Sequence, residues 1–194
     1  MKIVIIDYGA GNIQSIKFAI KRLGYDAILS NRAEEIQNAD KVIFPGVGEA
    51  SSAMKKLKAS GLDKLIPKLK QPVLGICLGM QLMCNSSEEG NTKGLGIFDL
   101  EVVRFPNTVK VPQIGWNQIE GLKSDLFREI QDKSHIYLVH SFYAPKGVDT
   151  IATSEYAMHY SAALQKENFY GTQFHPEKSG KVGEKILQNF LEKI

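Results

Sequence analysis

Residues 73–83 read VLGICLGMQLM, and they place Cys77 at a sharp turn between a buried strand and an apolar helix. The run from Val73 to Ile76 is short and apolar, which is typical of a strand inside a parallel sheet. Gly75 and Gly79 flank the cysteine, which indicates a turn too tight for a Cβ atom at either position. A strand, a nucleophile at the turn and a following helix form the nucleophile elbow of α/β hydrolases, here with cysteine in place of serine.

The same context predicts that the thiol of Cys77 is reactive. At the N-terminus of a helix, a thiol meets unpaired N–H groups and the positive end of the helix dipole, and both favour the thiolate. The alternative is a structural cysteine whose neighbouring glycines merely end a strand, because most free cysteines are buried and inert. Cys84 lies two helical turns further along the expected helix, among Leu and Met residues, and is interpreted as part of the core.

A histidine and a glutamate near the end of the chain supply the expected proton donor. His175 follows the last residues of an expected strand, Phe169 to Phe174, and precedes Pro176 and Glu177. Residues two apart in an extended chain point the same way, so Glu177 can lie behind His175 and stabilise its imidazolium form. Pro176 reinforces this geometry because it keeps His175 out of the α region. Taken alone, the His175-Pro176-Glu177 sequence also fits an ordinary turn with no catalytic role. His140, in an apolar strand, is either a satisfied buried histidine or part of the site wall.

A glycine-containing loop is the candidate oxyanion site. Residues 45–48 read PGVG and follow an expected strand, at the carboxyl edge of the sheet where α/β sites form. Gly46, Val47 and Gly48 can offer backbone N–H groups to a developing oxyanion, and the N–H of Leu78 is the second donor by analogy with elbow hydrolases. An ordinary β-turn is the alternative interpretation of this loop.

Around these motifs, the chain predicts an α/β fold with a mostly parallel central sheet flanked by helices. Short apolar runs alternate with amphipathic segments in the first half, which is the pattern of βαβ units. Strands are expected there at 2–7, 25–29, 41–44 and 73–76, with helices at 13–23, 50–58 and 62–69. The second half predicts additional strands at 100–105, 116–120, 136–142, 150–154, 162–166 and 169–174, in a mixed or antiparallel arrangement, before a closing helix at 183–193. Residues 1–194 contain no long linker, so a single domain is expected.

The composition limits the classes of function. The 24 Lys and Arg residues against 21 Asp and Glu give a formal net charge of +3, too balanced to predict binding to nucleic acid or to a membrane surface. The sequence has neither a signal-peptide pattern nor an apolar run near the ~20 residues of a membrane span, and its cysteines fit no disulfide framework, so a soluble protein of the reducing cytoplasm is expected. A dinucleotide-like glycine pattern at 9–14 lacks its third glycine, and no Walker sequence occurs, so no cofactor and no metal are expected.

Three motifs together resemble the triad-type, or class I, glutamine amidotransferases. They are PGVG at 45–48, GICLGMQ at 75–81 and QFHPE at 173–177. More narrowly, DYGAGN at 7–12, GWN at 115–117 and HPEKSG at 175–180 resemble the glutaminase subunits of imidazole glycerol phosphate synthases. The resemblance covers nearly the whole chain. It implies a flavodoxin-like amidotransferase fold with Cys77, His175 and Glu177 as the catalytic triad.

The resemblance further implies hydrolysis of L-glutamine to glutamate and ammonia through a glutamyl thioester. It implies that Gly46, Gln81, Ser141 and Phe142 help to hold glutamine, and that the backbone near Val47 rotates before the oxyanion hole is complete. Phe142 stands where a Tyr is common, which alters a pocket contact but not the chemistry. The implied partner is a barrel-shaped cyclase in a heterodimer. It uses the ammonia and a phosphorylated ribulosyl precursor to make imidazole glycerol phosphate and a carboxamide ribonucleotide in histidine biosynthesis.

A partner is also expected on physical grounds, because ammonia in neutral water is mostly protonated and needs a dry passage to a second active site. Asn12, Trp116, Tyr137 and Lys178 flank the motifs and are the expected interface residues, with a core Trp116 and a solvated Lys178 as the alternatives. Three other functions compete with this interpretation: a glutaminase that serves a different synthase, a cysteine peptidase on a similar sheet, and a binding module without catalysis.

Overall fold

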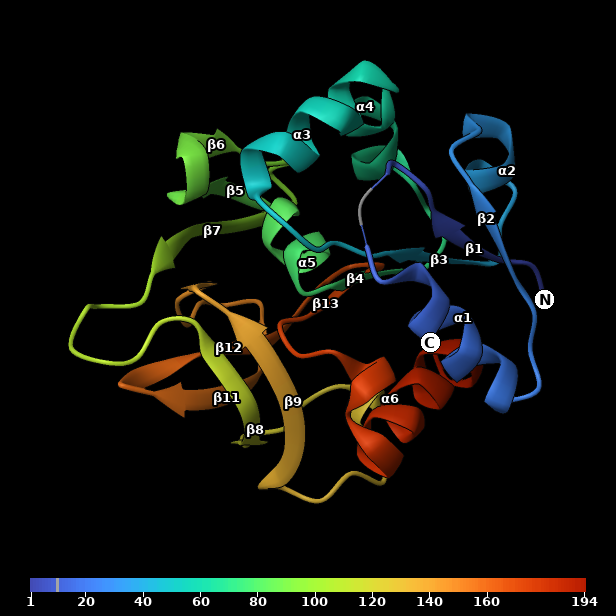
Figure 1. Cartoon of the computed structure of the whole chain (residues 1–194). Coiled ribbons are helices and arrows are strands. Elements are labelled where there is room, and N and C mark those ends of the chain that lie inside the picture. The colour runs from blue at the N-terminus through green and yellow to red at the C-terminus, as the bar shows by residue number, and fades with distance from the viewer. Residues whose placement is uncertain (10) are drawn as a thin grey trace.

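A computed structural model describes residues 1–9 and 11–194 and contains a central seven-stranded sheet with helices on both faces (Figure 1). The strand order is β11-β12-β13-β4-β3-β1-β2. The strands β2, β1, β3, β4 and β13 are parallel, whereas β12 and β11 extend the sheet antiparallel. Their bounds are β1 (Ile3–Ile6), β2 (Ala27–Ser30), β3 (Lys41–Phe44), β4 (Val73–Ile76), β11 (Thr150–Tyr156), β12 (Met158–Lys166) and β13 (Phe169–Thr172). The predicted fold class is confirmed.

Helices cover the two faces of this sheet because the strands that they cover are apolar on both sides. In β1, Ile3 and Ile5 pack in the cluster that contains α1 and α6, whereas Val4 and Ile6 pack in the cluster that contains α3. Figure 1 shows these two layers, with α3 and α4 on one side and α1 and α6 on the other. The helices are α1 (Ile13–Arg22), α2 (Ala33–Gln37), α3 (Ala50–Ala59), α4 (Leu62–Leu65), α5 (Leu78–Leu82) and α6 (Gly180–Glu192). Within residues 1–9 and 11–194, no helix combines the length and the apolar character that crossing a membrane requires.

Two smaller sheets and four 3₁₀ turns make up the remaining regular secondary structure of the described residues. One sheet has the order β10-β7-β5-β6, and the other is the β8-β9 hairpin. The strands are β5 (Cys84–Ser87), β6 (Thr92–Lys93), β7 (Phe98–Arg104), β8 (Gln113–Ile119), β9 (Ser134–His140) and β10 (Phe142–Tyr143). The 3₁₀ turns are η1 (Ile66–Lys68), η2 (Glu89–Asn91), η3 (Asp125–Phe127) and η4 (Pro176–Lys178). The segment predicted as one helix at 62–69 is α4 followed by η1, which has Pro67 in its first turn.

The helix after the elbow is shorter than the sequence predicts. It ends at Leu82, and Cys84 begins β5, so the placement of Cys84 two turns along a helix is wrong. The carbonyls of Leu82 and Met83 accept hydrogen bonds from the backbone N–H groups of Leu95 and Ile97, both at 2.8 Å. Pairing with a later segment therefore replaces further helical bonds. The interpretation of Cys84 as core is confirmed, because it is fully buried.

The parallel strands bring the predicted motifs to one edge of the sheet. The residues Tyr8, Pro45, Cys77 and His175 follow β1, β3, β4 and β13, and each of these strands ends at that edge. The carboxyl edge is where parallel α/β sheets form binding sites, because the loops that leave it meet there.

Candidate active site

The elbow holds Cys77 in a backbone conformation that few non-glycine residues adopt, with φ 53° and ψ −109°. Its N–H donates to the carbonyl of Thr172 at 2.7 Å, and its carbonyl accepts from the N–H of Gln81 at 3.2 Å. A Cβ at Gly79 would lie 2.0 Å from the carbonyl oxygen of Phe44, and one at Gly75 would lie 2.9 Å from the N–H nitrogen of Met80. The two glycines are therefore required by close backbone approach, as the spacing predicts.

The helix dipole contributes less to the Cys77 thiolate than the sequence suggests. The helix α5 has five residues, and a dipole that sums over so few peptides is small. A nearby cation is a stronger source of thiolate stabilisation than this short helix. That cation is available from His175, which lines the same pocket as Cys77.

His175 and Glu177 form a buried hydrogen-bonded pair. Nδ1 of His175 lies 2.8 Å from Oε1 of Glu177, and the two side chains are 3% and 0% exposed. His175 is extended, as predicted, but Glu177 lies in η4, so a 3₁₀ turn and not an extended chain brings the carboxylate behind the ring. Ser179 fixes this turn, because its hydroxyl donates to the carbonyl of His175 at 2.6 Å and accepts from the N–H of Tyr137 at 3.0 Å.

The charge state of His175 follows from its neighbours. Burial lowers the pKa of His175, but the polar contact with the Cys77 sulfur, the hydrogen bond to Glu177 and the charges of both groups outweigh burial and raise it from 6.5 to about 10. Nε2, the nitrogen that does not face Glu177, makes no well-aligned hydrogen bond to the described residues, although the Cys77 thiol is close enough to interact with it. At neutral pH the His175 ring is therefore an imidazolium, and Nε2 carries a transferable proton.

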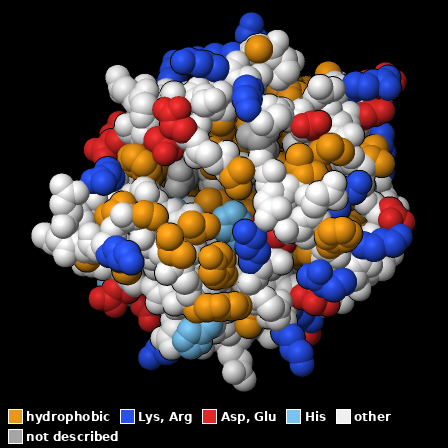
Figure 2. Space-filling view, viewed as in Figure 1, with side chains coloured by type: hydrophobic (Ala, Val, Ile, Leu, Met, Phe, Trp, Pro, Cys, Tyr) orange, Lys and Arg blue, Asp and Glu red, His pale blue; other side chains and the backbone are white. Residues whose placement is uncertain are grey.

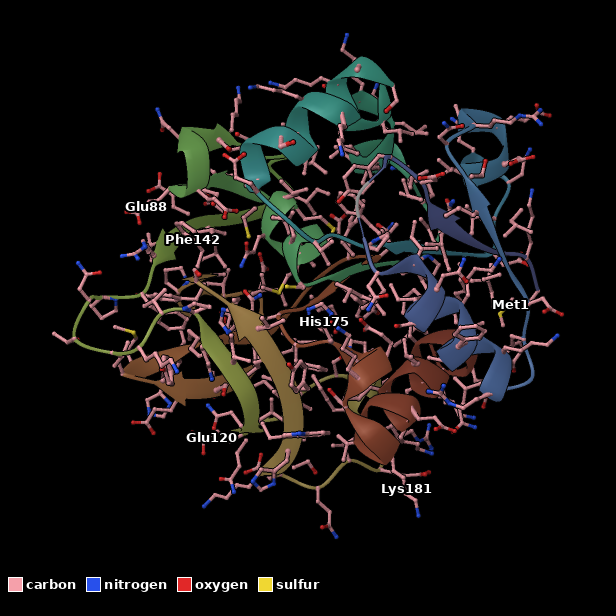
Figure 3. All side chains as sticks on the ribbon, in the orientation of Figure 1. Met1, Glu88, Glu120, Phe142, His175 and Lys181 are labelled. Atoms are coloured by element: carbon pink, nitrogen blue, oxygen red, sulfur yellow. The ribbon has the colours of Figure 1, made fainter. Side chains whose placement is uncertain are left out.

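A pocket of about 300 Å³ opens between the elbow, the 45–48 loop and β9 to β10. It is lined by Val47, Gly48, Cys77, Leu78, Gln81, Glu89, Pro112, Val139, His140, Ser141, Phe142 and His175. Figure 2 shows histidine atoms near the centre of this face, among hydrophobic side chains. Figure 3 shows His175 near α5, and Phe142 to its left in the view, near β7. The pocket therefore brings the candidate nucleophile and proton donor together.

The other predicted site residues are placed in two groups. Val47, Gly48, Leu78, Gln81, Ser141 and Phe142 line the pocket with Cys77. Gly46 does not, because it is pressed against the elbow, where a Cβ would lie 2.6 Å from the backbone nitrogen of Gly79. The amide nitrogen of Gln81 donates to the carbonyl of Phe142 and to Oε1 of Gln173, both at 2.9 Å, so its amide N–H groups brace the pocket wall.

Two polar residues of the site were missed by sequence reasoning. Gln173 is fully buried, and its amide nitrogen lies 3.7 Å from the sulfur of Cys77. Its position two residues before His175 was the available signal, since alternate residues share a side. Glu89 contributes a carboxylate to the pocket, and burial is the main cause that raises its pKa. It lies in η2, beyond β5, and no motif marks it.

Both interpretations of His140 apply. Nδ1 lies 2.7 Å from the carbonyl of Phe142 and Nε2 lies 3.3 Å from the hydroxyl of Tyr160, so the ring is satisfied by hydrogen bonds. It also lines the pocket. Burial lowers the pKa of His140 to about 4, despite the bond to Phe142, so the ring is neutral where His175 is charged.

The expected interface residues lie around the His175 turn. Trp116 is 57% exposed and packs edge-on against Tyr137, with ring centroids 6.0 Å apart. The core alternative for Trp116 is therefore wrong. The N–H of His175 donates to the carbonyl of Tyr137 at 3.0 Å, which ties this aromatic pair to the buried dyad. Lys178 is exposed in η4, and Asn12 is half-buried at the start of α1, which contacts η4.

Comparison with known proteins defines the class first. The family model for glutamine amidotransferase class-I matches residues 4–194, so the chain belongs to the class-I glutamine amidotransferase family. Solved structures share the fold at low identity. A GMP synthase subunit from Thermoplasma acidophilum has a TM-score of 0.76 and 23% identity, covering 98% of this chain and 92% of that one. PurLQS from Thermotoga maritima has a TM-score of 0.74 and 18% identity, covering 99% and 98%.

Curated relatives show which members of this family the chain resembles. The chain is 56% identical to imidazole glycerol phosphate synthase subunit HisH of Bacteroides fragilis (strain YCH46), over 99% of this chain and all of that protein. The subunit HisH of Haemophilus influenzae (strain ATCC 51907) is 47% identical, over 100% and 98%. That of Buchnera aphidicola subsp. Acyrthosiphon pisum is 46% identical, over 99% and 100%. Within the class-I amidotransferases, this chain is similar over its full length to HisH subunits.

Proposed function

We propose that this chain is the glutaminase subunit of an imidazole glycerol phosphate synthase and that it releases ammonia from L-glutamine. The observation that carries the proposal is the pocket in which Cys77, at a strained elbow, meets the buried His175–Glu177 pair. Full-length identity of 46–56% to HisH subunits supports the assignment to histidine biosynthesis. The family match over 4–194 supports one amidotransferase domain over residues 1–194, and we place the protein in the cytoplasm, where histidine biosynthesis would need it.

Glutamine fits the chemistry of the pocket. Its carboxamide is placed at Cys77, and its α-ammonium group at Glu89, the pocket-lining carboxylate. Ser141 and Phe142 line the side between these ends. A pocket of about 300 Å³ is at the lower limit of small-molecule sites, which suits a single amino acid. This size favours the glutaminase over the peptidase.

Acylation begins when the Cys77 thiolate attacks the amide carbon and the carbonyl oxygen becomes an oxyanion. Backbone N–H groups of the 45–48 loop and of Leu78 are the proposed donors to that oxyanion. The intermediate collapses as the C–N bond breaks, and Nε2 of His175 gives its proton to the leaving nitrogen. Ammonia leaves, and the glutamyl group remains on Cys77 as a thioester. Glu177 stabilises the imidazolium and fixes the tautomer of the neutral ring that remains after the proton has left.

Deacylation reverses the role of the histidine. The ring lost its proton to ammonia, so Nε2 now accepts a proton from a water molecule that attacks the thioester carbon. The second tetrahedral intermediate uses the same oxyanion donors. Its collapse breaks the C–S bond and releases glutamate, and the imidazolium and thiolate are restored. The glutamyl group is the only group transferred apart from protons, and no step is a redox step.

The relatives are named as subunits of a synthase, which supports a partner subunit for this chain. We propose that the partner is the barrel-shaped cyclase and that it docks over Trp116, Tyr137, Lys178 and Asn12. A solvent-exposed Trp beside the catalytic turn favours this site, because exposed aromatic residues at a contact centre contribute strongly to binding. Docking there would also cover the route by which ammonia leaves, so that it reaches the second site unprotonated.

The test is glutamate release from glutamine, measured for the chain alone and then in the presence of a substrate analogue and the cyclase subunit. Cys77→Ala is expected to lose all measurable release. Cys84→Ala removes a buried cysteine outside the pocket and is the matched control, with release close to that of the wild type. Release that depends on the cyclase supports both the reaction and the pathway. Release that persists in Cys77→Ala, or that never occurs with the partner present, refutes the proposal.

A further inference from the structure

A tyrosine outside the triad is hydrogen-bonded to the loop that is proposed to hold the oxyanion. Tyr8 follows β1, and its hydroxyl oxygen lies 2.8 Å from the carbonyl oxygen of Pro45. Because a carbonyl can only accept, the phenol donates. The Tyr8 side chain is 6% exposed, and its ring packs tilted against Phe44 with centroids 5.5 Å apart. The bond therefore lies in the interior, where water does not readily replace it.

The environment keeps this hydroxyl protonated. Burial, and then the charge of Cys77, raise the pKa of Tyr8 above its ordinary value of 10.0. Tyr8 also belongs to the buried cluster that contains Phe44 and Leu78. The side chain is thus a fixed donor within the packing that supports the elbow.

The bond from Tyr8 fixes one end of the 45–48 loop. A peptide group is planar, so holding the Pro45 carbonyl also fixes the direction of the Gly46 N–H. Gly46 is at the same time pressed against Gly79 of the elbow. Beyond this point the restraints are fewer, because Val47 is 43% exposed and Gly48, with φ 95°, has open space where a Cβ would lie. The loop has a fixed start and a permissive end that lines the pocket.

We propose that Tyr8 is a positioning residue for the oxyanion hole, because its hydroxyl holds the Pro45 carbonyl and with it the loop that supplies the donors. The inference rests on the proposed glutaminase function. Donors stabilise a transition state most when they need no reorganisation at the moment of reaction. Without the Tyr8 hydroxyl, the loop must be ordered in every turnover. The effect falls on the tetrahedral transition state and not on the binding of glutamine.

The test uses Tyr8→Phe in the full chain, in complex with the cyclase subunit. This change removes the hydroxyl and keeps the ring. The turnover number is expected to fall about tenfold, less than the ~10²–10³ typical when an oxyanion donor itself is removed. The KM for glutamine is expected to stay within about twofold, because the lost interaction acts only in the transition state. Alkylation of Cys77 by iodoacetamide forms no oxyanion, so its rate is expected to be unchanged.

Tyr25→Phe is the matched control. The Tyr25 hydroxyl bonds to Oε1 of Glu192 at 3.3 Å. Tyr25 precedes β2, so it lies at the edge of the sheet opposite the pocket. The turnover number of Tyr25→Phe is expected to match that of the wild type. Unchanged turnover in Tyr8→Phe overturns the inference. A fall in the turnover number together with an equal fall in the alkylation rate also overturns it, because that result indicates a distorted elbow. A variant that is too unstable to assay at any temperature overturns it as well. A wild-type complex without glutaminase activity refutes the proposed function instead.

Discussion

Replacing Glu177 by Gln tests whether the buried carboxylate controls the proton on His175. The substitution keeps the shape of a side chain that is 0% exposed and removes its charge. The hydrogen bond and the charge of Glu177 are two of the causes that raise the pKa of His175 to about 10. Without them, burial of the ring acts against fewer opposing interactions, so the pKa of His175 falls.

The magnitude follows from the role of this pair. Loss of the charged orienting residue in a serine protease triad lowers turnover by about 10⁴, because the imidazole adopts the wrong tautomer. Glutamine can still accept a hydrogen bond from Nδ1 of His175 through its oxygen, which retains part of the orientation. We therefore expect kcat/KM for glutamine to fall by about 10²- to 10⁴-fold, or roughly 2.7 to 5.4 kcal/mol in activation free energy.

The pH profile of kcat/KM distinguishes this effect from simple misfolding. Acylation needs the imidazolium as proton donor, so wild-type activity is expected to decline as the pH rises through about 10. In Glu177→Gln the alkaline limb moves to lower pH. The raised pKa of folded His175 also adds to the free energy of unfolding. This contribution is fully present below pH 6.5, the ordinary pKa of histidine, and is lost as the pH rises through about 10. In Glu177→Gln it is lost at a lower pH. Glu34→Gln, at an exposed carboxylate, is the control. An alkaline limb at the same pH in Glu177→Gln and in the wild type refutes the reasoning.

Three further predictions concern the elbow, the pocket and the partner. Gly79→Ala places a Cβ 2.0 Å from the carbonyl oxygen of Phe44 and is expected to destabilise the fold by about 1–3 kcal/mol, measured by urea denaturation; a loss below about 0.5 kcal/mol contradicts the close approach. Glu89→Gln is expected to raise the KM for glutamine about tenfold and to leave the rate of Cys77 alkylation unchanged, since a charge-assisted contact to the α-ammonium is weakened; an unchanged KM excludes that contact. Trp116→Ala is expected to weaken binding to the cyclase by about 2 kcal/mol in calorimetry without lowering the unfolding temperature; unchanged affinity places the interface elsewhere.

The strands and helices could be predicted where their signal is local. The short, mostly apolar runs at 41–44 and 73–76 are β3 and β4, because such runs are typical of strands buried inside a parallel sheet. The apolar stretch after Cys77 could not be predicted correctly. Its residues favour a helix, but the carbonyls of Leu82 and Met83 find partners in a segment that follows later in the chain. Strand pairing of this kind depends on sequence-distant groups and leaves no local pattern.

The candidate site divides in the same way. Gly75, Gly79 and Pro176 restrict their own neighbourhoods, so the sequence by itself determined a cysteine at a tight turn and a glutamate beside a histidine. Tertiary structure alone decided that the two meet, because β13 inserts beside β4 and pairs Thr172 with Ile76. It also decided that Glu89 and Gln173 enter the site and that Tyr8 reaches Pro45. Backbone preferences act over a few residues, whereas a pocket is set by which strands lie side by side, and that is fixed only when the whole sheet has formed.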